Sequence, residues 1–293
     1  MPELPDIVYI AGKLTGAVTG TPVREFTVKQ PVVLRNTFDR PPGELLTGRE
    51  ISTVGFKGPF FIFGFGETTE LVVNLMYSGR FQHQRQGEKQ DGHLCLAISF
   101  ADGFRLNLCD ENKMAKAYLV PGNDHTHVPG IASLGIDIES PAFTAEAFRA
   151  VAARNGRKQV RVMINDHTIL SSIGNAYADE ILFEAGIHPK TLVSRIPAAD
   201  IDRLHGAICS VMAWGIEEVR RAAQPIQVKV RGHMRVRNRH GQPCPRCGAT
   251  IRREGVRGYD VFFCPRCQPA TRRHFIDWNR PPAGDSGQDA ARG

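Results

Sequence analysis

The chain opens with Met-Pro-Glu, a start that can supply a nucleophile. An initiator methionine is readily removed before a small residue such as Pro2, and removal would free a secondary amine beside the Glu3 carboxylate. A free α-amine has a pKa of about 7.7–8.0, so an appreciable fraction is neutral at physiological pH and can attack a carbonyl-like carbon. Glu3 could then donate or accept the accompanying proton. The alternative interpretation is a plain helix start with proline in its first turn.

A second group of reactive side chains lies near the other end of the chain. Two Cys-x-x-Cys pairs are separated by sixteen residues, a spacing that lets four thiolates surround one tetrahedral Zn²⁺. Four cysteines close the coordination shell, so the ion would hold the fold and take no part in chemistry. A redox role is the weaker alternative, because two matched pairs occur without thioredoxin-like surroundings. The predicted ligands are Cys244, Cys247, Cys264 and Cys267.

The segment around these cysteines is strongly basic. Twelve Lys or Arg residues lie between Lys229 and Arg273 against two acids, so the rest of the chain is slightly negative although the whole carries +7. A local excess of this kind favours a polyanionic partner, the alternative being a basic tail that binds RNA or is only solvated. Between the cysteine pairs the sequence predicts a hairpin with a glycine turn that presents Arg252, Arg253 and Arg257 near its tip.

A glycine at a helix start offers a further anion site. In "SSIGNAY", Gly174 and Asn175 stand where a turn enters a helix, and free amides there suit a phosphate. Capping alone is the alternative explanation.

The elements that must position these residues fall into two halves. A short helix is expected at 2–14, followed by β-rich runs such as "FFIFGF", "ELVVNLMY", "HLCLAISF" and "FRLNLC", which predict two packed sheets. Helical patterns follow, with Thr144 as an N-cap, Phe143 and Phe148 as a hydrophobic staple, Gly186 as a stop, and a long helix at 197–221. The predicted fold is α+β: an N-terminal two-sheet β-sandwich with flanking helices, then a helical domain and a zinc-finger hairpin.

We predict a catalytic sandwich domain at 1–125, a linker at 126–138, a helical domain at 139–231, a zinc finger at 232–275 and a disordered tail at 276–293. No apolar run reaches the ~20 residues that a membrane helix needs, and the start lacks a signal segment. We therefore expect a cytoplasmic, nucleoid-associated protein. The other cysteines, Cys95, Cys109 and Cys209, are expected to be buried thiols.

Taken together, these motifs resemble the formamidopyrimidine-DNA glycosylase and endonuclease VIII family. "PELPDI" resembles the family's Pro-Glu-Leu-Pro-Glu start, and "SSIGNAYADEILFEAGIHP" its helix-two-turn-helix signature. "LGIDIES" resembles the segment that joins the domains, and the paired cysteines resemble the family's zinc finger. The resemblance covers roughly residues 2–268.

The resemblance implies a bifunctional DNA glycosylase with AP lyase activity. Pro2 would attack the sugar C1′ of a damaged nucleotide flipped out of the duplex, with Glu3 assisting proton transfer, and β- and δ-elimination would follow. Asn175, with Gly174 beside it, would hold a phosphate near the lesion. The implied partner is double-stranded DNA with a damaged base or an abasic site, bound by a monomer.

Several residues depart from the family pattern. Pro59 stands where the family carries a catalytic lysine, and Lys57, two residues early, is the candidate catalytic residue in its place. Tyr259 occupies the position of the finger arginine that grips phosphate, with Arg257 nearby; a tyrosine hydroxyl grips phosphate less strongly. The residues at the family's void-filling positions are Tyr77, Asn112, Lys113 and Met114, of which Tyr77 and Met114 are plausible apolar wedges.

Three functions remain open from the sequence. The first is a glycosylase and lyase with altered lesion preference, favoured by the intact Pro2 and Glu3. The second is a DNA-binding paralogue that recognises damage without efficient base excision, favoured by Pro59 and Tyr259. A zinc-ribbon RNA or ribosome factor would explain the basic segment but not the N-terminus.

Overall fold

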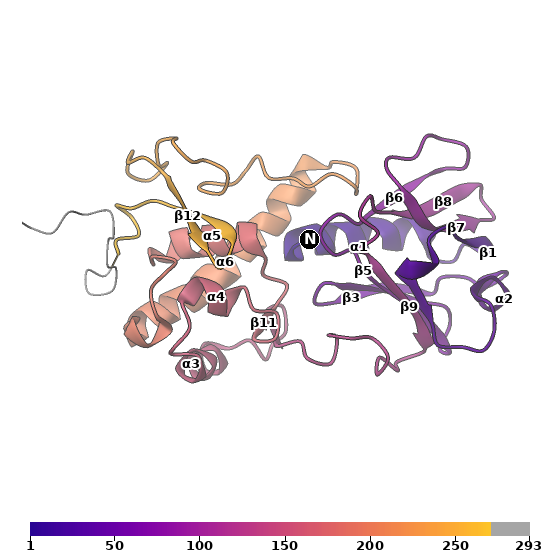
Figure 1. Ribbon diagram of the computed structural model, residues 1–293, viewed down its shortest axis with the longest axis horizontal. Coiled ribbons are helices and arrows are strands. Elements are labelled where there is room, and N and C mark those ends of the chain that lie inside the picture. Colours follow the sequence, from indigo (N-terminus) through magenta and orange to yellow (C-terminus); the bar gives the residue numbers. More distant parts are fainter. Residues whose placement is uncertain (271–293) are drawn as a thin grey trace, which may run out of the picture.

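Two β-sheets face each other in the N-terminal half of the computed structural model, which describes residues 1–270 (Figure 1). Their strands are β1 (Val23–Val28), β2 (Leu34–Asn36), β3 (Thr53–Lys57), β4 (Phe60–Gly64), β5 (Thr69–Asn74), β6 (Arg80–Arg85), β7 (Leu94–Phe100), β8 (Phe104–Cys109) and β9 (Lys116–Pro121). One sheet has the order β1-β7-β8-β6 and the other β2-β9-β5-β4-β3. Short helices α2 (Pro42–Leu46) and η1 (Pro31–Val33) connect strands at one end.

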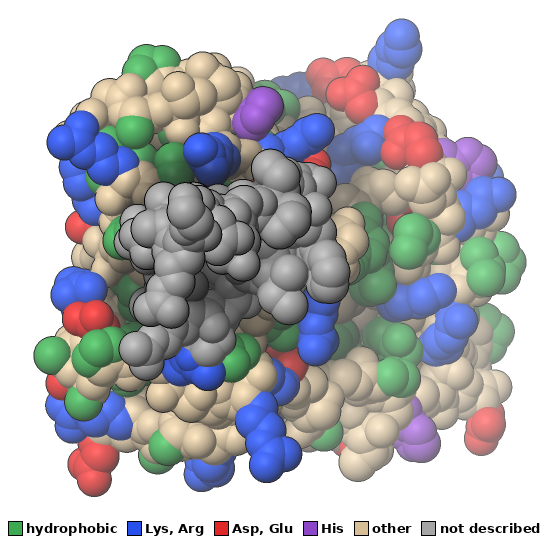
Figure 2. Space-filling model, turned by 60° about the vertical axis from the view of Figure 1, so that its left-hand side comes forward, with side chains coloured by type: hydrophobic (Ala, Val, Ile, Leu, Met, Phe, Trp, Pro, Cys, Tyr) green, Lys and Arg blue, Asp and Glu red, His purple; other side chains and the backbone are tan. Residues whose placement is uncertain are grey.

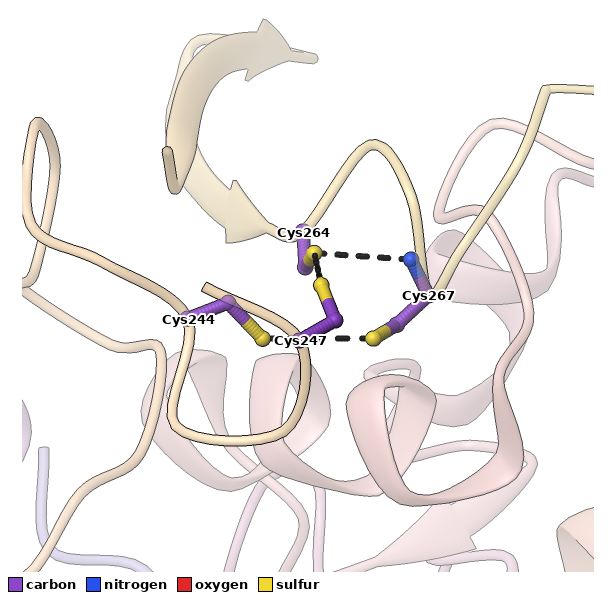
Figure 3. Close-up of side chains that lie close together, drawn as sticks. All are labelled: Cys244, Cys247, Cys264 and Cys267. Carbon is purple, nitrogen blue, oxygen red and sulfur yellow. Dashed lines mark hydrogen bonds between the residues drawn. The ribbon is translucent and has the colours of Figure 1, made fainter. Parts of the chain in front are cut away.

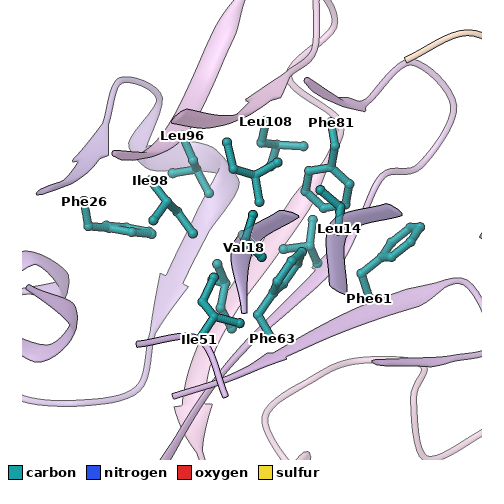
Figure 4. Packing of buried hydrophobic residues seen from close by; sticks show 14 of the residues in the cluster. Leu14, Val18, Phe26, Ile51, Phe61, Phe63, Phe81, Leu96, Ile98 and Leu108 are labelled. Carbon is teal, nitrogen blue, oxygen red and sulfur yellow. The ribbon is translucent and has the colours of Figure 1, made fainter. Parts of the chain in front are cut away.

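The core between the sheets follows from the alternation of side chains along each strand. On β5, Leu71 and Val73 point into the space between the sheets, and Val72 packs on the opposite face. Helix α1 (Leu4–Val18) closes this space (Figure 4). The ring of Phe81 packs edge-on against Phe61, with ring centroids 5.2 Å apart. The expected β-sandwich is confirmed.

Helix α1 belongs to both halves of the molecule. Its apolar side chains Ile7, Ile10, Leu14 and Val18 lie in the sandwich core. Leu4, at its first turn, is buried instead in the core of the helical half. The helix is longer than the predicted 2–14, because Leu14 and Val18 continue the same buried stripe for one more turn. The start of the chain is therefore held between the two halves (Figure 1).

The second half of the described chain is mainly helical. Its elements are β10 (Ile136–Asp137), α3 (Ala145–Arg154), α4 (Val160–Ile164), β11 (Leu170–Ser171), α5 (Asn175–Ala185), η2 (Val193–Arg195) and α6 (Ala198–Ala222). Thr144 caps α3, since its hydroxyl accepts from the Ala147 amide at 3.1 Å. The predicted staple of Phe143 and Phe148 is confirmed, with ring centroids 5.8 Å apart.

Helix α5 is the centre of this half and is almost entirely buried. Gly186 ends it with φ 68°, a left-handed conformation that glycine adopts without cost, as predicted. The long helix α6 packs across it at Gly215, where a Cβ atom would lie 2.3 Å from the Tyr177 ring. Tyr177 cannot yield, because it is fully buried and its hydroxyl hydrogen-bonds His233 Nε2 at 3.1 Å.

The segment expected to be a linker is partly packed. Val128 and Ile131 are buried with Phe60, Val72 and Tyr118 on the outer face of the five-stranded sheet. This connection therefore also shields apolar side chains of the sandwich.

The hairpin between the cysteine pairs consists of β12 (Arg252–Val256) and β13 (Tyr259–Phe263). A two-residue turn of Arg257 (φ 48°) and Gly258 (φ 82°) joins them, and Val256 pairs with Tyr259. Only Arg257 of the three predicted arginines lies at the tip. Arg252 and Arg253 are the first two residues of β12 and pair with Phe263 and Phe262, so they lie at the base of the hairpin.

One burial prediction was wrong. Cys95 and Cys109 are buried, but Cys209 is exposed on α6, on the side of that helix away from its apolar stripe. The predicted tail at 276–293 and the end of the predicted zinc-finger segment lie outside the described residues. Within residues 1–270, no helix is long and apolar enough to span a membrane.

The packing of α6 on α5 makes a first prediction. Gly215→Ala should destabilise the protein by about 1–3 kcal/mol, because the new methyl group overlaps a fixed ring. Gly206→Ala in the same helix meets nothing within 4 Å and should stabilise it by about 0.4–1 kcal/mol. Urea unfolding measures both, and equal effects at the two positions would contradict the packing described.

Candidate active site

The first residues of the chain are fixed by hydrogen bonds. Pro2 is buried, and Glu3 is only 6% exposed. The Glu3 amide donates to the Asp6 carboxylate at 2.9 Å, which starts helix α1. Asp6 in turn pairs with Arg231, whose guanidinium lies 2.6 Å and 2.8 Å from its two oxygens. The segment after α6 thus holds the start of α1.

The Glu3 carboxylate caps a helix from the other half of the molecule. Its two oxygens accept from the amides of Ala176 at 3.0 Å and Tyr177 at 2.9 Å, in the first turn of α5. Exposed amides and the helix dipole both favour a negative charge there. Gly174 must be glycine for steric reasons, since a Cβ atom would lie 2.5 Å from the Glu3 carboxyl carbon.

This contact corrects one expectation about the anion site. We expected the amides at this helix start to be free for phosphate, but those of Ala176 and Tyr177 are taken by Glu3. The sequence could not reveal this partner, because it lies more than 170 residues away.

Asn175 remains available beside this contact. Its side-chain oxygen accepts from Arg161 at 2.9 Å and from Asn165 at 3.2 Å. Two donors on the oxygen orient the amide so that its NH₂ group points away from them, as a phosphate donor requires. Asn175 also lines the cleft described next.

A cleft of about 520 Å³ opens between the two halves. The predicted residues Glu3, Tyr77, Gly174, Asn175, Arg257 and Tyr259 all line it. Met1, on the other side of Pro2, lines it too. Its remaining lining residues are Arg161, Val162, Asn165, Asp166, His167, Ala176, Lys229, Arg231, Arg237, Asn238 and Val256.

The cleft is positively charged. Arg161 and Arg237 share the single carboxylate of the fully buried Asp179, at 3.0 Å and 2.8 Å, so one positive charge of the three groups is left unbalanced. Lys229 and Arg257 have no carboxylate within ion-pair distance among residues 1–270. Figure 2 shows Lys and Arg side chains spread over the side of the molecule that carries the helical half, with acidic ones mostly toward its margins. These charges suit a polyanion.

The α-amine of the chain lies against this positive charge. The Met1 amine donates to the Tyr77 carbonyl at 3.5 Å, and Lys229 Nζ donates to the same oxygen at 3.3 Å. Burial, and then the neighbouring Lys229 ammonium, lower the pKa of the Met1 amine to about 5. The surroundings therefore favour the neutral form of the Met1 amine at pH 7. Lys229 was not among the predicted site residues, and its only signal in the sequence is its place at the start of the basic segment.

A buried carboxylate organises the two predicted wedge loops. Asp110 accepts from the Ser78 hydroxyl, beside Tyr77, and from the amides of Met114 at 2.8 Å and Ala115 at 2.7 Å. Although burial acts to raise it, these hydrogen bonds hold the pKa of Asp110 below its ordinary value. Tyr77 and Met114 are thereby kept 54% and 40% exposed. Asn112 also joins the loops, since its side-chain NH₂ group donates to the Ser78 hydroxyl at 3.0 Å.

Some predicted residues lie outside the lining of the cleft. Pro2 is one of them, since it lines a second, smaller pocket. Lys57 ends β3 and is exposed, and the following turn packs at Gly58 against Leu134. Asn112, Lys113 and Met114 lie in the loop after β8, and Lys113 adopts φ 54°. Their roles stay predictions.

The four predicted zinc ligands converge at the base of the hairpin (Figure 3). All four sulfur atoms lie within 4.8 Å of one another. Two pairs are 3.9 Å and 3.4 Å apart, close to the ~3.8 Å expected when four sulfurs surround zinc at 2.3 Å. The donor set and its spacing therefore fit a tetrahedral Zn²⁺. Around it, Phe183 of α5 packs with Val236, Ile251 and Phe262.

Models of known protein families match each part of this architecture. Residues 1–117 match the formamidopyrimidine-DNA glycosylase N-terminal domain, residues 134–225 its H2TH domain, and residues 241–270 the zinc finger found in FPG and IleRS. The formamidopyrimidine-DNA glycosylase of Exiguobacterium sibiricum is 30% identical over 273 residues, covering 92% of this chain and 99% of that one. That of Pelotomaculum thermopropionicum is 28% identical over 277 residues, with the same coverage.

Solved structures of similar proteins have the same fold as this chain. The Lactococcus lactis enzyme in complex with DNA containing an abasic site has a TM-score of 0.82 at 23% identity, covering 92% of this chain and all of that one. The MutM (FPG) protein from Thermus thermophilus has a TM-score of 0.79 at 27% identity, covering 91% and 98%.

Fold, domain content and cleft together define an enzyme of the DNA glycosylase class, which acts in base-excision repair. The chain belongs to the formamidopyrimidine-DNA glycosylase family, whose members also have AP lyase activity.

The contact between Glu3 and α5 makes a second prediction. Gly174→Ala should push the carboxylate away and expose the amides of Ala176 and Tyr177, so that their hydrogen exchange accelerates at least tenfold. Gly12→Ala, on α1 with nothing within 4 Å, is the matched control and should leave both amides protected. Unchanged exchange in Gly174→Ala would show that Glu3 is not what protects them.

Proposed function

We propose that the amine of Pro2, freed by removal of Met1, is the nucleophile of a glycosylase and AP lyase reaction. The observation that carries this proposal is that Met1 and Glu3, on either side of Pro2, both line the cleft. Pro2 itself lines a smaller pocket with Asp6 and Lys229, and removal of Met1 would uncover its nitrogen between two residues of the cleft wall. Burial and Lys229 lower the pKa of the Met1 amine, and the same surroundings would favour a neutral Pro2 amine, the form that attacks.

The reaction follows from ordinary carbon chemistry. The nitrogen lone pair forms a bond to C1′ of the flipped nucleotide while the bond from C1′ to the base breaks, and the base leaves with a proton. Opening of the sugar ring gives an iminium ion on Pro2. Loss of a C2′ proton then expels the 3′ phosphate, and a second elimination expels the 5′ phosphate. Glu3 is the carboxylate beside the nitrogen and would move protons in these steps.

The proposed partner is duplex DNA with a damaged or abasic nucleotide, bound by one copy of the chain. Lys229, Arg257 and the amide of Asn175 supply donors for phosphates along the cleft. The Lactococcus lactis structures, which contain DNA with an abasic site or with a Fapy-dG lesion, support a ligand of this class. The cleft is built from both halves of one chain, so a single copy suffices.

We further propose that the lesion preference is altered. Pro59 offers no side-chain cation at the start of β4, and Tyr259 replaces a guanidinium by a hydroxyl at the hairpin. Each change weakens a charge-assisted contact, so action on oxidised purines should be feeble relative to action on abasic sites.

Borohydride trapping tests the nucleophile. With duplex DNA that carries an abasic site, the processed protein should form a covalent adduct, because borohydride reduces the iminium ion. Retention of Met1 blocks the Pro2 nitrogen, and both this form and Pro2→Gly should trap at least a hundredfold less. Lys57→Ala is a control for a competing lysine amine and should leave Pro2 as the attached residue by mass spectrometry. An undiminished adduct with Met1 retained would refute the role of Pro2.

The alternative function is a DNA-binding paralogue without efficient catalysis. Pro59 and Tyr259 favour it, since both remove groups that the family uses. Tight binding of abasic DNA without any trapped adduct in the processed protein would establish this alternative.

We also propose one structural Zn²⁺ held by the four cysteines. The ion would join the two ends of the hairpin and leave no position for water or substrate. Its affinity for the folded site contributes to stability.

Loss of this ion should release the hairpin. Cys264→Ser should lower the zinc content well below one per chain, lower the melting temperature, and weaken binding to abasic DNA at least tenfold. Cys209→Ser is the matched cysteine control, because Cys209 is exposed on α6, and it should behave as wild type. Full stability and binding after chelation of the metal would contradict a structural role.

A further inference from the structure

Two tyrosines from opposite ends of the sequence meet across the cleft. The hydroxyl groups of Tyr77 and Tyr259 are 3.5 Å apart, although 182 residues separate them in the chain. Both rings are unusually open for aromatic side chains, at 54% and 45% exposure. Both also line the cleft.

The backbone beneath Tyr77 holds it in a fixed place. It lies in a tight turn in which the Met76 amide donates to the Asn74 side chain at 2.9 Å and the Gly79 amide to the Leu75 carbonyl at 2.9 Å. Ser78, the next residue, is tied to the buried Asp110. An exposed ring on so constrained a turn is positioned for a partner outside the folded chain.

Tyr259 is held equally well on the other side. It begins β13 and pairs with Val256 at the closed end of the hairpin. The next residue, Asp260, accepts from Arg237 through its backbone carbonyl at 2.8 Å, which ties the hairpin to the cleft wall. The contact between the two hydroxyls is exposed and long, so it adds little and separates easily.

The surroundings indicate what the rings bind. Lys229 donates to the Tyr77 carbonyl, and Arg257 lies two residues from Tyr259; both cations line the cleft. Cations that follow a phosphate backbone, interleaved with exposed aromatic rings, form the pattern that binds unpaired nucleic acid, because every base presents a π face for stacking.

We propose that Tyr77 and Tyr259 form a stacking site for an unpaired nucleobase next to the damaged nucleotide. This inference rests on the proposed function, since it takes DNA as the ligand. The two rings part as the strand enters, and each contributes a face to the same base. The zinc hairpin then holds the strand by stacking, and single-stranded DNA with an abasic analogue binds within about tenfold of the duplex.

Alanine and phenylalanine variants separate the ring from the hydroxyl. Tyr77→Ala and Tyr259→Ala should each weaken binding of an abasic-analogue oligonucleotide about tenfold, a size typical of losing one stacked ring. Tyr77→Phe and Tyr259→Phe should bind as wild type. Because stacking releases no counterions, the dependence of affinity on salt should be the same in all four variants, whereas Arg257→Ala should reduce it. Val32→Ala, at another side chain that is 54% exposed, is the control for loss of surface area.

Photocrosslinking identifies the stacked residues directly. An oligonucleotide with 5-iodouracil beside the abasic analogue should attach to Tyr77 or Tyr259 on irradiation, and mass spectrometry would locate the adduct. The double alanine variant should lose less affinity than the product of the two single losses, because one base is shared.

Wild-type affinity in both alanine variants, or crosslinks confined to other residues, would overturn the stacking site while leaving DNA binding intact. Failure of the wild-type protein to bind abasic DNA would instead overturn the proposed function, and the stacking site with it.

Discussion

The carboxylate of Glu3, bound at the start of α5, is the contact on which the rest of the structure depends. It joins the first helix of the chain to a helix more than 170 residues later, and it does so with a buried negative charge on two backbone amides. A buried charge is stable only when it is fully paired, so the two halves cannot shift relative to each other without a large cost. The absence of a side chain at Gly174 makes this approach possible.

A second contact extends the same network. Asp6 binds the Glu3 amide and is itself paired with Arg231, whose guanidinium lies 5.5 Å from the centre of the Tyr177 ring. The position of the α-amine is thus determined by α1, by α5 and by the segment after α6. These contacts also exclude water from the start of the chain, and burial is the largest cause of the lowered pKa of the Met1 amine. The same buried contacts therefore fix the position of the α-amine and lower its pKa.

Local patterns predicted much of this structure, and distant pairings explain what they missed. The four-cysteine cluster followed from spacing, the end of α5 from Gly186, and the strands from runs of apolar residues. By contrast, nothing local shows that the amides at the start of α5 bind Glu3, or that Asp110 joins two loops. Cys209 was misjudged because apolar neighbours in sequence do not fix which face of a helix points inward. The hairpin was assigned correctly, but of the three arginines expected near its tip only Arg257 lies there.

Local sequence also could not show which lysine lies near the α-amine. Sequence order drew attention to Lys57, because it lies two residues before Pro59. In the fold, Lys57 is exposed at the end of β3, where solvent screens its charge, whereas Lys229 shares the Tyr77 carbonyl with the α-amine. The Coulomb interaction falls with distance, and after burial the Lys229 ammonium is the next cause of the lowered pKa of the amine. A positive charge is therefore present at the amine, and it comes from the opposite half of the chain.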